Sequence, residues 1–293
     1  MDWITELLRM VQLLCGSLLF GVPLFSLYGP REVSLLMGRT LWVGAAGMLL
    51  VSLASVVLQA SSLAGTSPAT ITFADLAWYM SDTHIGRISG LRTCGIAGYI
   101  ALVAFATAGK SRDTSQTLIG SVLFGSFALT GHGAENAGHA LSDFVHLIMA
   151  GVWIGALVSL CGLLVHASRN DQYISATVRG LNSFSRLGFA VVALLVASGI
   201  GNALFAFGVP SADQLYLSEY GRTLLLKLGL LTAMLVLAAV NRYRLAPLLE
   251  RRMCTNNSAL ALRSLRYTVL TETAIAVAVI GLAAHLASTE PPV

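Results

Sequence analysis

Eight apolar segments constrain the fold of this 293-residue chain more than any other feature. Each approaches the roughly 20 mostly apolar residues that a helix needs to cross a bilayer. The hydrocarbon core offers the backbone no hydrogen-bond partner, so every crossing segment must be helical. The sequence therefore predicts an all-α polytopic membrane protein, a single transmembrane domain over residues 1–293 surrounded by membrane lipid. The eight expected transmembrane helices are 8–28, 41–63, 89–109, 116–132, 141–165, 187–208, 223–241 and 266–287.

The basic residues predict how the chain is oriented. Most of the 18 Lys and Arg residues fall in the expected loops 29–40, 110–115, 166–186 and 242–266. Cytoplasmic loops carry such an excess, so both termini are expected to be extracytoplasmic. No small-residue cleavage motif follows the first span, which is therefore expected to be retained rather than removed as a signal peptide. This topology accounts for the net charge of +4, and we expect no nucleic-acid partner.

A histidine-rich segment before and within the fifth expected span predicts a metal site. Three of the six histidines, His132, His139 and His146, stand at seven-residue intervals. Seven residues are two helical turns, so histidines spaced this way on one helix share a face. Asp143 joins that face, and Met149 follows about one turn deeper. Imidazole, carboxylate and thioether groups together favour a transition metal, copper above all; the alternative is a solvated polar cap.

Two further histidines are candidate metal ligands on the same side of the membrane. His285 lies near the outer end of the last span and could complete the site. His84 follows Met80 by four residues and forms a His/Met pair with it if that loop is helical; otherwise it is an interfacial histidine. Imidazole and carboxylate suit Cu(II), whereas sulfur ligands deeper in the spans, such as Cys15 and Met48, suit Cu(I). This gradient predicts a copper ion that is captured outside and then handled as Cu(I).

The two halves of the chain resemble each other. Residues 11–21 align with residues 145–155 without a gap, so the first and fifth spans correspond. Both enter the membrane from the same side, which predicts a parallel 4+4 repeat with halves 1–132 and 141–288. A glutamine of the first half then takes the place of His146.

Charged groups inside spans are costly and need a reason. We expect Arg92 and Lys227 to extend toward the outer surface along their aliphatic stems. Glu272 lies about two turns inside the last span and is expected to be buried and either paired or protonated, with a structural role favoured over a proton relay. Asn202 and Asn241 are candidates for the same interior network.

At the histidine segment the sequence resembles the copper resistance protein D (CopD/PcoD) family of bacterial inner-membrane proteins. The resemblance rests on residues 141–146, 151–155 and 220–228 and covers nearly the full length. It implies a multi-pass, eight-helix protein of the inner membrane that moves copper, as Cu(I) or Cu(II), across that membrane. It also implies a separate periplasmic copper-binding partner of the CopC type. Asp143 and His146 are the positions that match the family's motif.

Two other functions remain open at this point. A b-type cytochrome would hold haem between His132 and either His285 or His146. A copper sensor or scaffold would bind the ion without passing it. The sequence contains no nucleotide-binding glycine loop, no His-Glu-x-x-His and no metal-ATPase Cys-x-x-Cys, so we expect no enzymatic activity.

Overall fold

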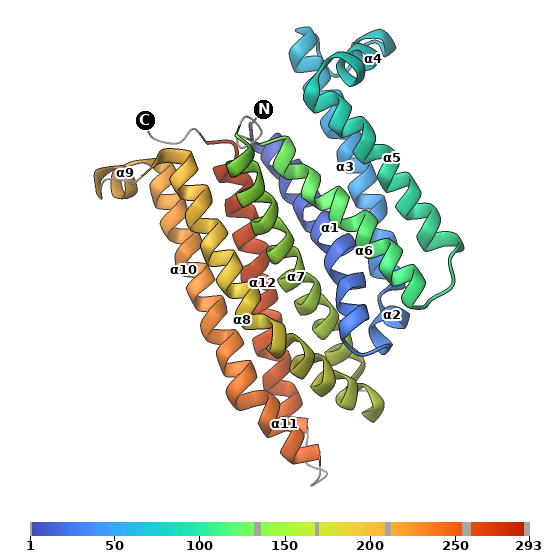
Figure 1. Cartoon of the computed structure of the whole chain (residues 1–293), viewed down its shortest axis with the longest axis vertical. Helices are drawn as coiled ribbons and strands as arrows, with labels where there is room; N and C mark the ends of the chain where they lie inside the picture. Colours follow the sequence, from blue (N-terminus) through green and yellow to red (C-terminus); the bar gives the residue numbers. More distant parts are fainter. Residues whose placement is uncertain (1, 132–135, 168–169, 209–211, 254–258, 290–293) are drawn as a thin grey trace.

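A computed structural model describes residues 2–131, 136–167, 170–208, 212–253 and 259–289. Within these ranges the chain contains helices and no strand, which confirms the predicted all-α class. The long helices run up and down beside one another as a bundle (Figure 1). The elements are α1 (Asp2–Tyr28), α2 (Glu32–Leu36), α3 (Gly38–Ala64), α4 (Phe73–Asp82), α5 (His84–Phe105), α6 (Lys110–Gly125), η1 (Ser126–Leu129), α7 (Ala137–Ala167), α8 (Asp171–Phe207), α9 (Ala212–Leu217), α10 (Glu219–Val240), η3 (Asn241–Leu245), α11 (Ala246–Met253) and α12 (Ala259–Leu286).

Seven of the described helices are long and apolar enough to cross a membrane: α1, α3, α5, α7, α8, α10 (continued by η3 and α11) and α12. The fourth expected span, 116–132, differs from this pattern. It forms α6, an α-helix of 16 residues, which passes at Ser126 into the 3₁₀-helix η1. Sixteen α-helical residues measure about 24 Å, which is shorter than a hydrocarbon core of about 30 Å.

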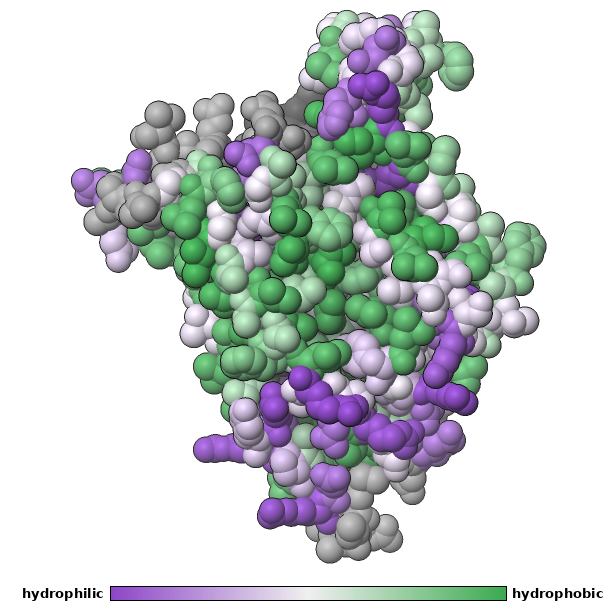
Figure 2. All heavy atoms as spheres, viewed as in Figure 1, coloured by the Kyte–Doolittle hydropathy of each residue, from purple (hydrophilic) through white to green (hydrophobic). Residues whose placement is uncertain are grey.

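The surface of the bundle suits a bilayer. Apolar side chains cover its middle, whereas hydrophilic side chains gather at its lower end (Figure 2). Large apolar residues of the long helices are widely exposed, among them Val43, Leu91 and Phe105. In water such a surface would be unfavourable, whereas lipid chains solvate it without cost.

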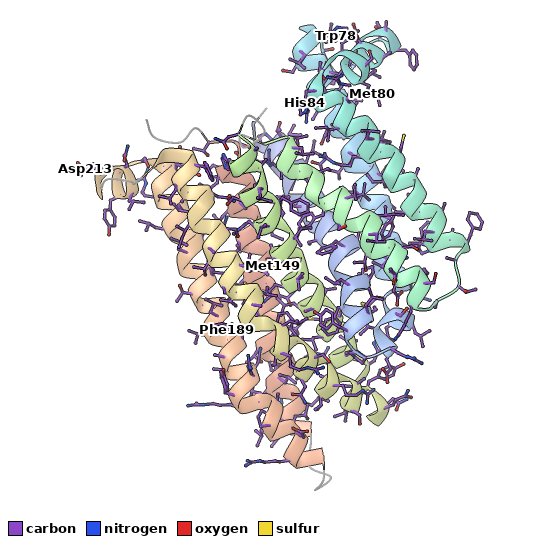
Figure 3. All side chains as sticks on the ribbon, in the orientation of Figure 1. Trp78, Met80, His84, Met149, Phe189 and Asp213 are labelled. Carbon is purple, nitrogen blue, oxygen red and sulfur yellow. The ribbon has the colours of Figure 1, made fainter. Side chains whose placement is uncertain are left out.

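The end of the bundle where α1 begins and α12 ends is called its outer end, after the predicted orientation. At this end α3 and α5 carry a helical extension built around α4. Thr72 and Asp75 form a reciprocal capping box that begins α4. Tyr79 is almost fully buried against α3, and its hydroxyl donates to Gln59 Oε1 at 2.7 Å. Trp78 lies on this extension, which projects beyond the rest of the bundle (Figure 3).

Helices α1 and α7 pack with their backbones in contact at the centre of the bundle. A Cβ atom added at Gly21 would overlap the carbonyl oxygen of Gly151. One added at Gly155 would overlap the backbone of Gly21 in the same way. Glycines therefore permit this close approach, as small residues commonly do between membrane helices.

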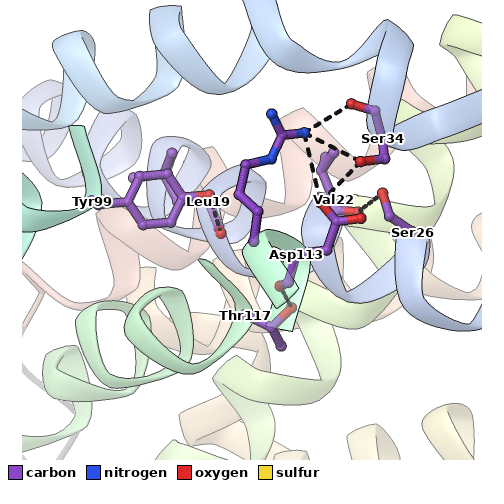
Figure 4. Close-up of polar contacts among 8 residues, drawn as sticks. Leu19, Val22, Ser26, Ser34, Tyr99, Asp113 and Thr117 are labelled. Carbon is purple, nitrogen blue, oxygen red and sulfur yellow. Dashed lines mark hydrogen bonds and ion pairs between the residues drawn. The ribbon is translucent and has the colours of Figure 1, made fainter. Parts of the chain in front are cut away.

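A proline inside α1 leaves a carbonyl that bonds to α5. Pro23 has no N–H group to donate to the carbonyl of Leu19, four residues earlier. The hydroxyl of Tyr99, from α5, donates to that carbonyl instead at 2.8 Å (Figure 4). Nearby, Ser34 of α2 donates to Asp113 Oδ1 of α6 at 3.0 Å (Figure 4). Polar contacts thus tie α2, α5 and α6 into the first half of the bundle.

Candidate functional site

Three of the predicted site residues, His139, Asp143 and His146, lie on one face of α7 and meet α8. This confirms the shared face that their spacing predicts. The two helices run antiparallel, so residues at matching intervals on α8 meet each of the three in turn. From the outer end inward, these partners are Phe205, Asn202 and Ser198.

Asp143 interacts with polar or charged groups of three other helices. Asn202 of α8 donates from Nδ2 to Asp143 Oδ1 at 3.3 Å. Arg9 of α1 and Lys227 of α10 interact electrostatically with the carboxylate. A Cβ atom added at Gly131 would lie 3.6 Å from Arg9 Nη2 and 3.9 Å from Asp143 Oδ2, which places both groups beside that glycine. The two cations offset part of the cost of burying the carboxylate.

His146 lies between α7 and α8, with its Nδ1 atom 3.1 Å from Ser198 Oγ. The hydroxyl of Ser198 also lies 2.6 Å from the carbonyl oxygen of Leu194, to which it donates. Because its single proton is used in that bond, the hydroxyl accepts from His146, and Nδ1 carries the ring proton. Nε2 then keeps its lone pair, as in metal-binding histidines whose other nitrogen donates to the protein.

His139 begins the same face, one turn before Asp143 and two turns before His146. Its ring stacks on Phe205 with centroids 5.2 Å apart and an interplanar angle of 10°. The first turn of α7 is fixed by Asn136, whose Oδ1 accepts from the amides of Gly138 and His139. His139 and His146 are separated by about 10 Å of helix rise, which is too far for both to bind one ion.

The described part of the chain brings no three His, Cys, Asp or Glu side chains close enough to hold one metal ion together. Asp143 with either neighbouring histidine is the pair that helical spacing allows. Met149 lies deeper on α7, partly buried against the core (Figure 3). His132 lies outside the described residues. Metal binding by these residues stays a prediction.

The other two predicted ligands lie elsewhere. His285 is in contact with two carboxylates: its Nδ1 atom is 3.1 Å from Glu6 Oε1, and its Nε2 atom is 3.5 Å from Glu219 Oε1. These contacts join α12, α1 and α10 at the outer end. His84 is the exposed first residue of α5, on the extension built around α4 (Figure 3). Met80, at the end of α4, packs over Gly90 of α5.

The expectation that Arg92 extends to the outer surface is wrong. Its side chain is buried, with 6% of the residue exposed, because η1 supplies partners inside the bundle. Nε donates to Ser126 Oγ at 2.9 Å, and the guanidinium carbon lies 3.9 Å from the centroid of the Phe127 ring. For Lys227, a half-buried residue, the same expectation stays a prediction; its ammonium group interacts electrostatically with Asp143 and His146.

The predicted burial of Glu272 and its contact with Asn241 are confirmed. Trp153 Nε1 donates to one carboxylate oxygen at 3.0 Å, and Asn241 Nδ2 donates to the other at 2.9 Å. The inclusion of Asn202 in this network is wrong, because that residue pairs with Asp143 on the outer half of α7.

Sequence reasoning missed most partners of these groups. Ser198, Asn202 and Phe205 carry a detectable signal, since their spacing of four and three residues mirrors that of the α7 face. Arg9 and Glu6 carry no such signal, because charges near a helix end are ordinary in membrane proteins.

The fold and these polar faces define a polytopic helical membrane protein with polar and ionisable groups between its helices at one end. Two family models match the chain: "Copper resistance protein D-like, N-terminal domain" over residues 1–143 and "Copper resistance protein D" over residues 178–286. The chain is 33% identical over 290 residues to copper resistance protein D of Pseudomonas syringae pv. tomato, covering 94% of this chain and 92% of that protein. It belongs to the copper resistance protein D family, whose members handle copper in the membrane.

Two further relatives agree with this assignment. Inner membrane protein YebZ of Escherichia coli K12 is 29% identical over 260 residues, which is 84% of each chain. Copper transport protein CutJ of Bacillus subtilis 168 is 37% identical over 119 residues, 39% of this chain and 21% of CutJ. No solved structure matches the chain. Together with its apolar helices, these relatives identify a multi-pass inner-membrane protein of copper resistance and transport.

Proposed function

We propose that this protein takes up copper from the periplasm at Asp143 and His146 and passes it across the inner membrane. The observation that carries the proposal is the bond from His146 Nδ1 to Ser198, because it leaves Nε2 free less than one turn from a carboxylate. Residues three apart on a helix are neighbours, so this imidazole and carboxylate can reach one ion. Such ligands suit Cu(II) and, with a thioether nearby, Cu(I).

Arg9 and Lys227 give the site a way to release its ion. Both cations already interact with Asp143, so copper has to compete with them for the carboxylate. A site in a conduction path must bind strongly enough to capture an ion and weakly enough to let it leave. Met149, deeper on α7, offers the next ligand for an ion handled as Cu(I).

The proposed path requires eight crossings with both termini in the periplasm. The Glu6–His285 contact supports this count, because it joins the start of α1 to the end of α12 at one end of the bundle. A chain whose ends lie on the same side crosses an even number of times, and α6 with η1 supplies the crossing beyond the seven longer helices. Basic residues of the opposite end, such as Arg112 and Arg179, favour a cytoplasmic location for it.

We further propose that the halves 1–132 and 141–288 are a parallel repeat. Gln12 and His146 occupy aligned positions on α1 and α7. Gln12 Nε2 donates to Ser55 Oγ of α3 at 3.2 Å, much as His146 meets Ser198 of α8. Matching contacts at aligned positions support a common origin for the two halves.

The outer end is where a periplasmic copper-binding partner of the CopC type would deliver the ion. His139 on α7, and His84 with Met80 on the extension, are our candidates for receiving it. No catalytic activity is part of this proposal.

The test is copper analysis of the purified protein beside the variants His146→Ala and Asp143→Asn. We expect the wild type to retain copper and each variant to lose at least about tenfold in affinity, since one lost ligand interaction exceeds about 1.4 kcal/mol. His166→Ala is the matched control, because His166 lies at the other end of α7 and bonds to the Gly162 carbonyl. Equal copper in His146→Ala and wild type would contradict the proposal.

Transport is tested separately in sealed vesicles. Accumulation of copper above that of empty vesicles, lost in Asp143→Asn, supports transport. Copper binding without accumulation would instead identify a scaffold or sensor. A Soret band in the purified wild type, lost in His146→Ala, would favour the b-type cytochrome.

A further inference from the structure

A cleft of about 200 Å³ opens among α7, α8, α10 and α12 in the half of the bundle that lies deeper than the Asp143 site. Below its middle, α8 turns away from α10 toward the lower end of α7 (Figure 1). Phe189 of α8 lines the cleft and is 80% exposed (Figure 3). This residue belongs to the apolar, membrane-spanning part of α8, so the mouth of the cleft faces lipid.

The inner wall of the cleft carries a buried carboxyl group. Glu272 is 2% exposed, and its two oxygens accept one hydrogen bond each, from Trp153 and from Asn241. A carboxylate has about four acceptor positions in total, so each oxygen keeps one. An acidic residue at membrane depth usually marks a functional site. Two bonds hold Glu272 in place, and the spare acceptor positions remain for a ligand that donates.

The rest of the lining selects the shape of that ligand. Trp153 and Phe184 meet edge to face with ring centroids 6.0 Å apart, and Phe189 and Leu235 add apolar walls. Aromatic walls favour a flat ring, which packs against their faces and edges. A few polar groups in an apolar pocket then fix its orientation.

We propose that this cleft binds a lipid-soluble hydroquinone. A hydroxyl of the ring donates to Glu272, the ring packs against Trp153 and Phe184, and the apolar tail leaves past Phe189 into the bilayer. The reduced form is preferred over the quinone because only the hydroquinone has O–H groups to donate to a carboxylate. A phospholipid acyl chain would fill the apolar part but leave the carboxyl group unused.

The position of the cleft suggests what the ligand does there. Trp153 follows His146 by seven residues on α7, which places it about 10 Å deeper along the helix. One hydroquinone can reduce two Cu(II) ions in succession, yielding one quinone, two Cu(I) ions and two protons, which leave one after the other through Glu272. This step rests on the proposed copper site, whereas hydroquinone binding does not.

The test uses the full chain in lipid nanodiscs and radiolabelled decylubiquinol, a short-tailed benzohydroquinone, as the probe. Gly188→Leu fills the cleft, since Gly188 lines it and a Cβ atom there meets no atom within 4 Å. Gly229→Leu on α10 is the matched control, because it has the same open space and does not line the cleft. We expect saturable binding of one probe per chain in wild type and Gly229→Leu. We expect at least tenfold weaker binding in Gly188→Leu, at an unchanged thermal unfolding midpoint.

Glu272→Gln tests the role of the carboxyl group. We expect it to weaken decylubiquinol binding about tenfold, the effect of losing a hydrogen bond to a charged group, and to change decylubiquinone binding less. The proposal is overturned if wild type shows no saturable binding, or if Gly188→Leu and Gly229→Leu bind the probe equally. It is also overturned if the cleft retains a phospholipid that oleate displaces and decylubiquinol does not.

The electron-transfer step has its own readout. Cu(I) is trapped by a Cu(I)-specific chelator after Cu(II) is added to nanodiscs loaded with decylubiquinol. Formation of Cu(I) that disappears in both Gly188→Leu and His146→Ala supports the step. Probe binding without Cu(I) formation removes the step and leaves the binding site standing. Failure of probe binding leaves the copper site to be judged by its own metal analysis.

Discussion

Arg92 in α5 and Lys227 in α10 both place a cation among the helices, but their surroundings differ. Arg92 is held by the hydroxyl of Ser126 and the ring of Phe127 in η1, which carry no charge. Lys227 interacts electrostatically with a carboxylate and an imidazole, those of Asp143 and His146. The first arrangement is complete in itself, whereas the second can exchange one cation for another. The comparison teaches that a buried charge is structural or functional according to its partners rather than its depth.

The same contrast separates two aligned pairs. Gln12 and Ser55 form an amide–hydroxyl bond between α1 and α3. His146 and Ser198 form an imidazole–hydroxyl bond between α7 and α8. A glutamine offers no ring nitrogen to a metal, so the first pair only joins its helices. We therefore expect the first half of the molecule to have a structural role and the second half to bind the metal.

The largest expected effect comes from separating the two halves. Gly155→Leu places a side chain where the backbone of Gly21 lies, and a close-packed interior cannot absorb that volume. We expect no folded protein in detergent by size-exclusion chromatography. Gly98→Leu on α5 is the control, since a Cβ atom there meets nothing within 4 Å; it should behave as wild type. A folded Gly155→Leu protein would show that the halves do not depend on this contact.

Next in size is the difference between the two cations. Arg92→Ala removes several hydrogen bonds and a cation–π contact, so we expect the free energy of unfolding to fall by about 3 kcal/mol at unchanged copper stoichiometry. Lys227→Ala removes a competitor for Asp143, and we expect copper affinity to rise about tenfold. Unfolding in mixed micelles measures the stability of Arg92→Ala, and copper titration measures the affinity of Lys227→Ala. An unchanged copper affinity in Lys227→Ala would show that Lys227, like Arg92, has only a structural role.

A smaller effect is expected for the serines. Ser198→Ala removes the acceptor that fixes the ring of His146, and losing such a supporting bond costs about tenfold in metal affinity. Ser55→Ala removes the aligned hydroxyl, and copper affinity should not change. Copper titration of both variants, with a Cu(I) chelator as competitor, measures the two affinities. Equal losses in the two would mean that both halves contribute to the site.

The smallest expected effect is at the outer end of the α7 face. Phe205→Leu removes the ring that stacks on His139, an interaction of about 1 kcal/mol. We expect copper uptake by vesicles to slow a few-fold while copper retained at equilibrium stays constant. A loss of retained copper as large as that of His146→Ala would place His139 in the same site instead of before it.

The sequence predicted the helical class and the shared face of α7 because both follow from periodicity and apolar length. It could not predict where Arg92 points, since that depends on η1, a turn that the pattern of 116–132 hides within an expected span. The sequence also could not predict that Asn202 contacts Asp143 rather than Glu272. Whether two polar residues of different helices are in contact depends on how the helices are rotated and aligned. Residue spacing within one helix predicts neither the rotation nor the alignment.

Pro23 has an effect beyond α1. Its missing N–H group leaves the Leu19 carbonyl to the hydroxyl of Tyr99, and no water is available at that depth to take over. A phenylalanine at position 99 would therefore strand an acceptor in hydrocarbon, unless an ordinary residue at position 23 restored the helical bond. Changes at these two positions, 76 residues apart, should be tolerated together more readily than the change at position 99 alone. The proline of α1 thus makes a tyrosine hydroxyl necessary in α5.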